Sequence, residues 1–415
     1  MITATLAQAD LSFPNETLTT VTFGSCHKRK YEDARIWQTI AQVPAQAWLW
    51  LGDAVYPPLR RIAPVSVLRD EYQALRQSQG YQALCAAVPR TLGTWDDHDY
   101  GGNDMGKHMP DREARRDAFF EFLGHPSAAA AAAANNNNNN HRHRRQGVYH
   151  AVTFGQAPQQ VKIVFLDTRS FRDDHCGLPS VATYFPLGAG VACATRWATA
   201  GLLASYCRQQ MATLLGDAQW TWLEHELATS QASLHIIVSS VQVLSTNPVM
   251  EGWCHFPSER TRLLRLLRQT TGALLLSGDV HYAEILDAAS ALVTEVTSSG
   301  LTHVCTKHVL YGPLCQPLLH AFGAHRRQPD GYYLQRNFGS LDIDWETSSV
   351  NVKIHDALSG NVVLQTGALP IIGRLPSVDA AFIDEIPTCM NDHLIPVAVA
   401  VLSGLIVLLL LWRRR

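Results

Sequence analysis

Short apolar runs that end in glycine, serine or aspartate recur along this chain and constrain its fold more than any other feature. Each run has the length of a buried strand and is followed at once by polar residues. The runs are TVTFGSC (20–26), AWLWLGD (47–53), VKIVFLDTR (161–169), LHIIVSSVQ (234–242) and ALLLSGDVH (273–281). Apolar residues at helical spacing occur between them in YEDARIWQTIAQ (31–42), REARRDAFFEFLG (112–124) and GDAQWTWLEHELATS (216–230). This alternation predicts an α/β domain in which helices cover a sheet.

The C-terminal part of the domain has a different pattern. NFGSLDIDW (337–345), VNVKIHD (350–356) and ALSGNVVLQTG (357–367) alternate polar and apolar residues, which is typical of half-buried antiparallel strands. We therefore expect a second sheet, added late in the chain. One domain would cover residues 18–375, after an N-terminal segment at 1–17, with alanine and asparagine runs making 127–146 a low-complexity loop.

The last residues resemble a membrane anchor. Residues 394–412 are nineteen in number and carry no charge, which is enough to cross a hydrocarbon core of ~30 Å. Residues 376–393 would link the domain to this transmembrane helix, and the basic tail 413–415 would stay cytoplasmic. We thus expect a single-pass membrane protein with a lumenal or extracellular domain. A buried core helix is the alternative interpretation.

Nine cysteines fit an oxidising compartment. Those expected to pair, in a connectivity that the sequence leaves open, are Cys176, Cys193, Cys207, Cys254, Cys305 and Cys315. Asn15 begins an Asn-Glu-Thr glycosylation sequon. No signal peptide is visible at the N-terminus. Either the sequence begins downstream of its natural start, which we favour, or the protein is tail-anchored with a cytosolic domain.

Metal-ligand residue types gather where four of the predicted strands end. These ends are Gly24-Ser25-Cys26, Gly52-Asp53-Ala54-Val55-Tyr56, Trp95-Asp96-Asp97-His98-Asp99 and Gly278-Asp279-Val280-His281. Each alone has a simpler interpretation, such as a buried cysteine or a helix-capping aspartate. Because the carboxyl ends of strands in an open α/β sheet border one crevice, we expect the four to meet there. Carboxylates at close range repel one another, so the sequence predicts a polynuclear metal site.

The ligand types point to two different metals. A tyrosine ligand favours a strongly Lewis-acidic ion such as Fe(III), and the cysteine requires a metal that tolerates thiolate. The carboxylates suit a harder divalent ion such as Ca, Mn or Mg, with Zn as a further option. A formal net charge of -2 gives no reason to expect a nucleic-acid-binding surface, and the oligomeric state stays open.

Seven motifs give the chain a specific resemblance. FGSC, LWLGDAVY, TWDDHD, FLDTRSFR, LLGDAQWTWLEHEL, SGDVHYAE and NFGSLDIDW occur in this order over residues 20–367. In these motifs the chain resembles PhoD-type alkaline phosphatases and phosphodiesterases, a branch of the calcineurin-like metallophosphoesterases. The resemblance implies a sandwich of two sheets flanked by helices (αββα).

The resemblance also implies roles for individual residues. Cys26, Asp53, Tyr56 and His281 would hold the iron-like ion, and Asp53, Asp97 and Asp279 the second metal. His98 would lie beside the phosphate, where it could stabilise charge on a phosphoryl oxygen and protonate the leaving group. Arg169 would grip the phosphate, or else pair with Asp173 or Asp174. Asn103 could bind a further calcium-like ion, although its Gly-Gly-Asn-Asp setting departs from the bacterial pattern.

The predicted function is that of a membrane-anchored phosphohydrolase for phosphomonoesters or phosphodiesters, in which a metal-bound hydroxide attacks phosphorus. Asp96 and Asp99 would orient neighbouring groups. One alternative is a catalytically inactive receptor domain on the same fold, which would typically have lost a ligand. Another is an iron oxidase, which the hydrolytic ligand set disfavours.

Overall fold

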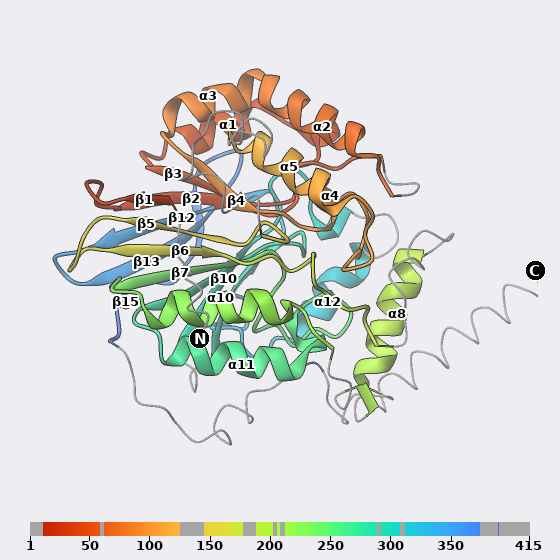
Figure 1. Cartoon of the computed structure of the whole chain (residues 1–415). Helices are drawn as coiled ribbons and strands as arrows, with labels where there is room; N and C mark the ends of the chain where they lie inside the picture. Colours follow the sequence, from red (N-terminus) through yellow and green to blue (C-terminus); the bar gives the residue numbers. More distant parts are fainter. Residues whose placement is uncertain are drawn as a thin grey trace, which may run out of the picture.

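The computed structural model describes residues 11–58, 62–124, 145–176, 188–201, 206–207, 212–288, 292–307, 312–373 and 389. Two sheets pack face to face, and helices cover both outer faces (Figure 1). The predicted α/β domain with two sheets and flanking helices is therefore confirmed. Most of the predicted low-complexity loop 127–146 lies outside the described residues.

Within the described residues, the first sheet has eight strands in the order β1-β5-β6-β7-β8-β10-β9-β11. Their bounds are β1 Leu11–Phe13, β5 His150–Phe154, β6 Val161–Phe165, β7 Leu234–Ser239, β8 Ala273–Ser277, β9 Ala283–Ala288, β10 Val293–Ser298 and β11 Tyr332–Tyr333. Strands β6, β7, β8 and β10 run parallel to one another, so their carboxyl ends lie at one edge.

The second sheet has the order β14-β13-β12-β2-β3-β4, with β15 paired to β13. Its strands are β2 Thr20–Gly24, β3 Ala47–Leu51, β4 Thr91–Thr94, β12 Asn337–Asp344, β13 Ser349–Asp356, β14 Val362–Gln365 and β15 Leu369–Pro370. The expectation of a separate sheet formed late in the chain is wrong, because β12 pairs with β2 in antiparallel register. Strand β2, near the start of the chain, and the last strands share one sheet. Local patterns predict strands but not which strands pair.

Helices form the two outer layers. The second sheet is covered by α1 Ala34–Ala41, α2 Val65–Gln77, α3 Gln79–Ala87 and α5 Arg112–Phe122, and the first by α10 Gly216–Ala228 and α11 Pro257–Arg268 (Figure 1). Shorter or peripheral helices are η1 Arg29–Tyr31, α4 Asp97–Tyr100, α8 Gly188–Gly201, η3 Trp253–His255, η4 Cys305–Lys307 and α12 Gly312–Ala321. The predicted apolar side of α10 is confirmed, since Trp220, Leu223 and Leu227 are all buried.

The main core lies between the two sheets. Phe23 and Leu49 of one sheet and Ile163, Ile236 and Leu276 of the other belong to one buried cluster. Each fully buried side chain of this size contributes about 1.5–3 kcal/mol of transfer free energy. The packing of these strands fixes the relative positions of their carboxyl ends, and therefore of the residues that follow them.

Disulfides join Cys176 to Cys207, Cys254 to Cys389 and Cys305 to Cys315. The prediction is wrong for Cys193, which is a free thiol, while Cys389 takes part instead. Sequence spacing carries no information about which cysteines meet in space.

The predicted transmembrane segment 394–412 lies outside the described residues, as do the basic tail and nearly all of the linker 376–393. Among the helices that the structure does describe, none is both long and apolar enough to span a bilayer.

Candidate metal centre

The candidate site forms where loops from both sheets meet. Strands β2, β3 and β4 run parallel in one sheet, and β6, β7 and β8 in the other. Gly278, after β8, lies so close to the β2 and β3 loops that a Cβ on it would be 2.6 Å from Ser25 Oγ and 2.8 Å from the Leu51 carbonyl oxygen. Only a glycine lets the two sheet edges approach this closely at that point.

The first group of ligand types is brought together by the fold. One ligand atom each from Cys26, Asp53 and His281 lies within 4.8 Å of the others. The Tyr56 hydroxyl donates to Asp53 Oδ2 at 2.6 Å and lies 3.1 Å from His281 Nε2. The Cys26 sulfur is 3.9 Å from Asp53 Oδ2. We call these four residues the Cys26 cluster.

Unusual backbone geometry accompanies this cluster. Cys26, Asp53, Asp279 and His281 have φ values of 63°, 52°, 73° and 61°, in the left-handed region that few residues other than glycine adopt. Such conformations cost roughly 1–3 kcal/mol each and persist where surrounding structure fixes them. These four strained residues all follow strand ends. The backbone strain lowers the stability of the fold and directs the four side chains toward the site.

A second group adjoins the first through Asp53. Ligand atoms of Asp53, Asp97 and His98 lie within 4.8 Å of one another. Asp97 Oδ1 is buried and has no hydrogen-bond partner among the described residues. Burial, followed by the charges of Asp96, Glu251 and Asp97, raises the pKa of Asp279 well above its ordinary value, but Asp279 is not among the described residues whose ligand atoms meet within 4.8 Å. The two groups that the fold brings together share Asp53, and the place of Asp279 in the second ligand set stays a prediction.

The protonation equilibria show why this arrangement fits a cation. Burial, followed by the charges of Asp97, Asp96 and Asp99, raises the pKa of Asp53 well above its ordinary value. Burial and then the charge of Asp53 likewise raise the pKa values of Cys26 and Tyr56. A thiol, a phenol and carboxyls that resist ionisation become good ligands once a metal supplies the compensating charge. The donor set therefore fits a metal centre.

Asp99 orients the loop that carries two of the candidate ligands. Its Oδ2 accepts from the backbone N–H groups of Ala54 and Asp96 at 3.2 Å, and its Oδ1 accepts from Val55 N–H and the Tyr72 hydroxyl at 3.2 Å. These bonds fix the turn between Asp53 and Tyr56. The predicted orienting role of Asp99 agrees with this geometry.

Arg169 has ion-pair partners that differ from the pairing considered from the sequence. Its side chain is fully buried, with Nε 2.6 Å from Asp96 Oδ1 and Nη1 2.9 Å from Glu251 Oε1. It pairs with neither Asp173 nor Asp174 among its described ion pairs. Nε and Nη1 of Arg169 are thus engaged by carboxylates, whereas Nη2 lies near Asp96 Oδ1 without a hydrogen-bond partner among the described residues. The phosphate-gripping role of Arg169 stays a prediction.

Glu251 is the centre of a buried ion-pair network beside the metal-ligand residues. Arg172 Nε lies 3.3 Å from Glu251 Oε1, and Arg196 Nη1 lies 2.9 Å from Asp104 Oδ2. Asp97, Asp104 and Glu251 also bring carboxylate oxygens within 4.8 Å of one another. We call the full set the Glu251 network; its members are Asp96, Asp104, Arg169, Arg172, Arg196 and Glu251.

Sequence reasoning missed most of this network. Glu251 lies in a long loop after β7, 82 residues from Arg169, and no local motif marks it. Asp104 was detectable in principle, since it ends the acidic stretch TWDDHDYGGND, and its backbone N–H donates to Asp97 Oδ2 at 2.8 Å. Asn103, the predicted ligand next to it, is half-buried, and its role in metal binding stays a prediction.

Half-buried aromatic and basic side chains form the solvent side of the site. The Tyr56 ring lies 4.0 Å from the ring of His98 and 4.9 Å from that of His303 (centroid distances). Burial is the main cause that lowers the pKa of His98. The Lys28 ammonium is 5.5 Å from the Tyr56 ring centroid. His303 and Lys28 were both missed from the sequence.

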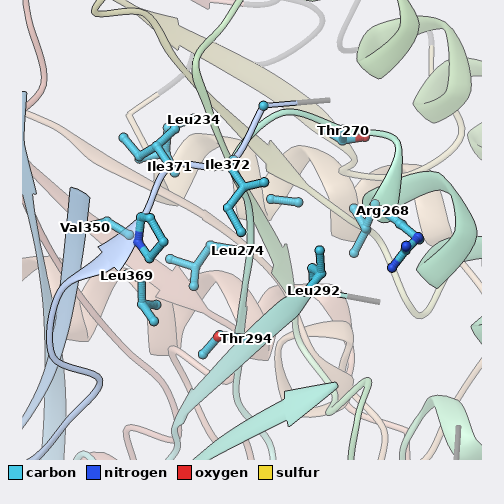
Figure 2. Close-up of a pocket in the computed structure, with 15 residues that line it drawn as sticks. Leu234, Arg268, Thr270, Leu274, Leu292, Thr294, Val350, Leu369, Ile371 and Ile372 are labelled. Carbon is cyan, nitrogen blue, oxygen red and sulfur yellow. The ribbon is translucent and has the colours of Figure 1, made fainter. Parts of the chain in front are cut away.

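A separate apolar cavity lies away from these residues. Figure 2 shows Leu234, Leu274, Ile371 and Ile372 around it, near the last strand of the domain. Its volume of about 90 Å³ is well below the ~300 Å³ of typical small-molecule sites. It contains none of the candidate metal-ligand residues, so the strand-end site is the better candidate for catalysis.

Fold and donor set together define a metal-dependent enzyme of the two-sheet α/β class. The profile of the PhoD-like phosphatases matches residues 21–354, most of the domain. The chain belongs to the PhoD-like phosphatase family, and so is a metal-dependent phosphatase or phosphodiesterase.

A solved structure of PhoD is similar in fold, with a TM-score of 0.56. The alignment has 16% sequence identity and covers 94% of this chain and 78% of that chain. At this identity the likeness shows the fold alone. No curated protein matches the sequence.

Proposed function

We propose that the enzyme hydrolyses phosphate esters at a two-metal centre. Cys26, Asp53, Tyr56 and His281 would hold an Fe(III)-like ion, and Asp53, Asp97 and Asp279 a second, divalent ion such as Ca, or Mn, Mg or Zn. Metals bound there would supply a nucleophilic hydroxide near neutral pH and Lewis acidity toward the phosphoryl oxygens.

One observation carries this proposal. Tyr56 Oη, Asp53 Oδ2 and His281 Nε2 are linked by distances of 2.6 and 3.1 Å, and Cys26 Sγ is 3.9 Å from Asp53 Oδ2. Four donors from three separate strand-end loops thus converge on one point. An inactive receptor domain would have no need to retain every ligand type, which argues against that alternative.

The chain's own residues would position the substrate and move its protons. His98 is anchored because its backbone N–H donates to Asp53 Oδ1 at 3.1 Å, and its ring packs on Tyr56. Its Nδ1 has no hydrogen-bond partner among the described residues. We infer that His98 contacts a phosphoryl oxygen and protonates the leaving group. Arg169 would act indirectly by holding Asp96, which lies beside Asp97 in the chain.

Tyr56→Phe tests the iron assignment. Protein purified without added metals should contain iron and absorb visible light through phenolate-to-iron charge transfer. The variant should lose this absorption, and turnover of p-nitrophenyl phosphate and bis-p-nitrophenyl phosphate should fall with it. Tyr333→Phe is a matched control, because Tyr333 also donates to a carboxylate, Asp356 Oδ2 at 2.7 Å, but far from the site in sequence and outside the cluster. Unchanged absorption in Tyr56→Phe would contradict the ligand assignment.

We further propose that the domain lies in an oxidising compartment and is anchored by residues 394–412. Three disulfides support the compartment, since such bonds are rare in the cytosol. The uncharged run and basic tail support the anchor. Protease protection of the domain in sealed microsomes, lost on adding detergent, is the expected result; digestion without detergent would contradict the topology.

A further inference from the structure

Two nitrogens of Arg169 are already hydrogen-bonded to Asp96 and Glu251, so a second cation near the metal centre would strengthen phosphate binding. A phosphate group that binds at the metal centre would face the half-buried side of the site, formed by Tyr56, His98 and His303. A cation of the protein at that side would be free to contact it. Lys28 occupies this position.

The backbone at Lys28 is fixed to the site. Lys28 N–H donates to Thr302 Oγ1 at 2.7 Å, and Thr302 Oγ1 donates to the Cys26 carbonyl oxygen at 3.2 Å. Thr302 immediately precedes His303, whose ring is 4.3 Å from that of His281. Lys28 is therefore tied both to the loop of a candidate ligand and to the loop after β10.

The Lys28 side chain carries a charge that no described carboxylate neutralises. Its ammonium is 5.5 Å from the Tyr56 ring centroid and 5.7 Å from that of Tyr31. Within the part of the chain that the structure describes, no carboxylate oxygen lies within the 4.0 Å of an ion pair. The next residue differs, since Arg29 Nη2 pairs with Glu71 Oε1 at 3.1 Å. Lys28 is half-buried against aromatic rings, and its ammonium group is available to contact a bound anion.

We propose that Lys28 contacts the phosphoryl group of the substrate and favours phosphomonoesters over phosphodiesters. This inference rests on the proposed function, which leaves the ester class open. A monoester carries two negative charges near neutral pH and a diester one, so a fixed cation stabilises the monoester more. A diester also places a second organic substituent on the phosphoryl group, where the monoester offers another oxygen to the ammonium.

The test compares matched substrates in the metal-loaded, full-length enzyme. Lys28→Ala should lower kcat/KM for p-nitrophenyl phosphate about 10- to 100-fold, the size of a lost hydrogen bond to a charged group, and for bis-p-nitrophenyl phosphate less than about threefold. The loss on the monoester should appear mainly in KM, because the contact already exists in the ground state. Inhibition by inorganic phosphate should weaken by a similar factor.

Two further variants separate a contact from a general effect. Lys28→Arg should retain most of the monoester preference, since it keeps the charge. Lys107→Ala removes a cation that is paired with Asp173 outside the site, and should leave the preference unchanged. Iron content and melting temperature of Lys28→Ala should match those of the wild type, because the side chain pairs with no described carboxylate.

The outcomes are distinguishable. If the wild type hydrolyses either ester and Lys28→Ala affects both equally, the inference about Lys28 fails and the proposed function stands. If the metal-loaded wild type hydrolyses neither ester, the proposed function fails and this inference falls with it.

Discussion

The Glu251 network and the Cys26 cluster lie side by side in this enzyme and both contain buried carboxylates. They differ in whether basic side chains pair with those carboxylates. In the Glu251 network, guanidinium groups of Arg169, Arg172 and Arg196 lie next to the carboxylates. In the Cys26 cluster no described arginine or lysine pairs with Asp53. The carboxylates of both groups are buried.

Their protonation equilibria reflect this difference. Burial opposes ionisation of Glu251, but the charges of Arg169 and Arg172 outweigh it and lower its pKa well below the ordinary value. Burial raises the pKa of Asp104 to about 6 even though Arg196 opposes the rise. The pKa of Asp53 is raised well above its ordinary value, since burial and other carboxylates act in the same direction. The chain itself supplies the cations that keep Glu251 ionised, whereas no described arginine or lysine does this for Asp53, which is left to a cation from outside.

Asp53→Asn removes the carboxylate of the Cys26 cluster that both proposed metals share, and should give the largest effect on activity. Asp53 is shared by both proposed metals, so its loss should reduce metal content and lower kcat/KM about 10³-fold or more. Elemental analysis and ester turnover measure the two effects. Asp342→Asn is the control, because Asp342 pairs with Lys353 at the surface. Intact hydrolysis in Asp53→Asn would rule out the proposed centre.

Arg169→Met removes the cation that pairs with Asp96 and Glu251 in the Glu251 network. It leaves Asp96 and Glu251 buried without their main partner, which costs about 3–5 kcal/mol of the free energy of unfolding. Urea unfolding measures the loss, and Arg35→Met at an exposed pair with Asp33 should cost far less, because water screens that pair. A variant of unchanged stability that binds phosphate poorly would instead support a phosphate-gripping role for Arg169.

The pH dependence of stability should sharpen the contrast. Burial raises the pKa of Asp96 and of Asp99 to about 7, from an ordinary value of 3.8. The folded, metal-free protein therefore holds protons that the unfolded chain releases, and these groups lower its stability as pH rises from about 4 to about 7. Burial raises the pKa of the ligand Asp53 in the same direction, and metal binding requires its ionised form, so the metal-induced rise in melting temperature should grow with rising pH by several degrees. Equal metal effects at the two ends of this interval would contradict the assignment.

Cys193→Ser should have the smallest effect. Its sulfur lies 3.6 Å from Arg196 Nη2, at the periphery of the Glu251 network, and is not part of a disulfide. We expect a change below about 0.5 kcal/mol in the free energy of unfolding. Cys207→Ser, which opens the disulfide to Cys176, should cost about 3–4 kcal/mol for its 31-residue separation. A large loss in Cys193→Ser would mean that the thiol supports Arg196.

Much of the ligand set could be predicted because its signals are local. A buried strand followed by Gly-Asp or Gly-Ser is visible in a short window, and parallel strands bring such ends to one edge. Cys26, Asp53 and His281 were found in this way, and the structure brings their ligand atoms within 4.8 Å of one another. Their metal-binding roles stay predictions.

Partners that depend on distant segments could not be predicted. Glu251 reaches Arg169 from another loop, and Cys389 reaches Cys254 across 135 residues. Lys28 follows Cys26 by two residues, but a basic residue in a sequence shows neither whether a carboxylate neutralises it nor what it faces. Arg169 illustrates the same limit, since its motif was visible and its partners were not.

The sequence by itself determined the α/β class, the elements that carry the ligands and the residue types available for metal chemistry, because periodicity and strand-end motifs act over a few residues. Only the tertiary structure decided that the last strands join β2 in one sheet and which carboxylates pair with an arginine. The physical reason is that strand pairing and charge compensation depend on distances in space, and contacts between segments far apart in the chain leave no local pattern.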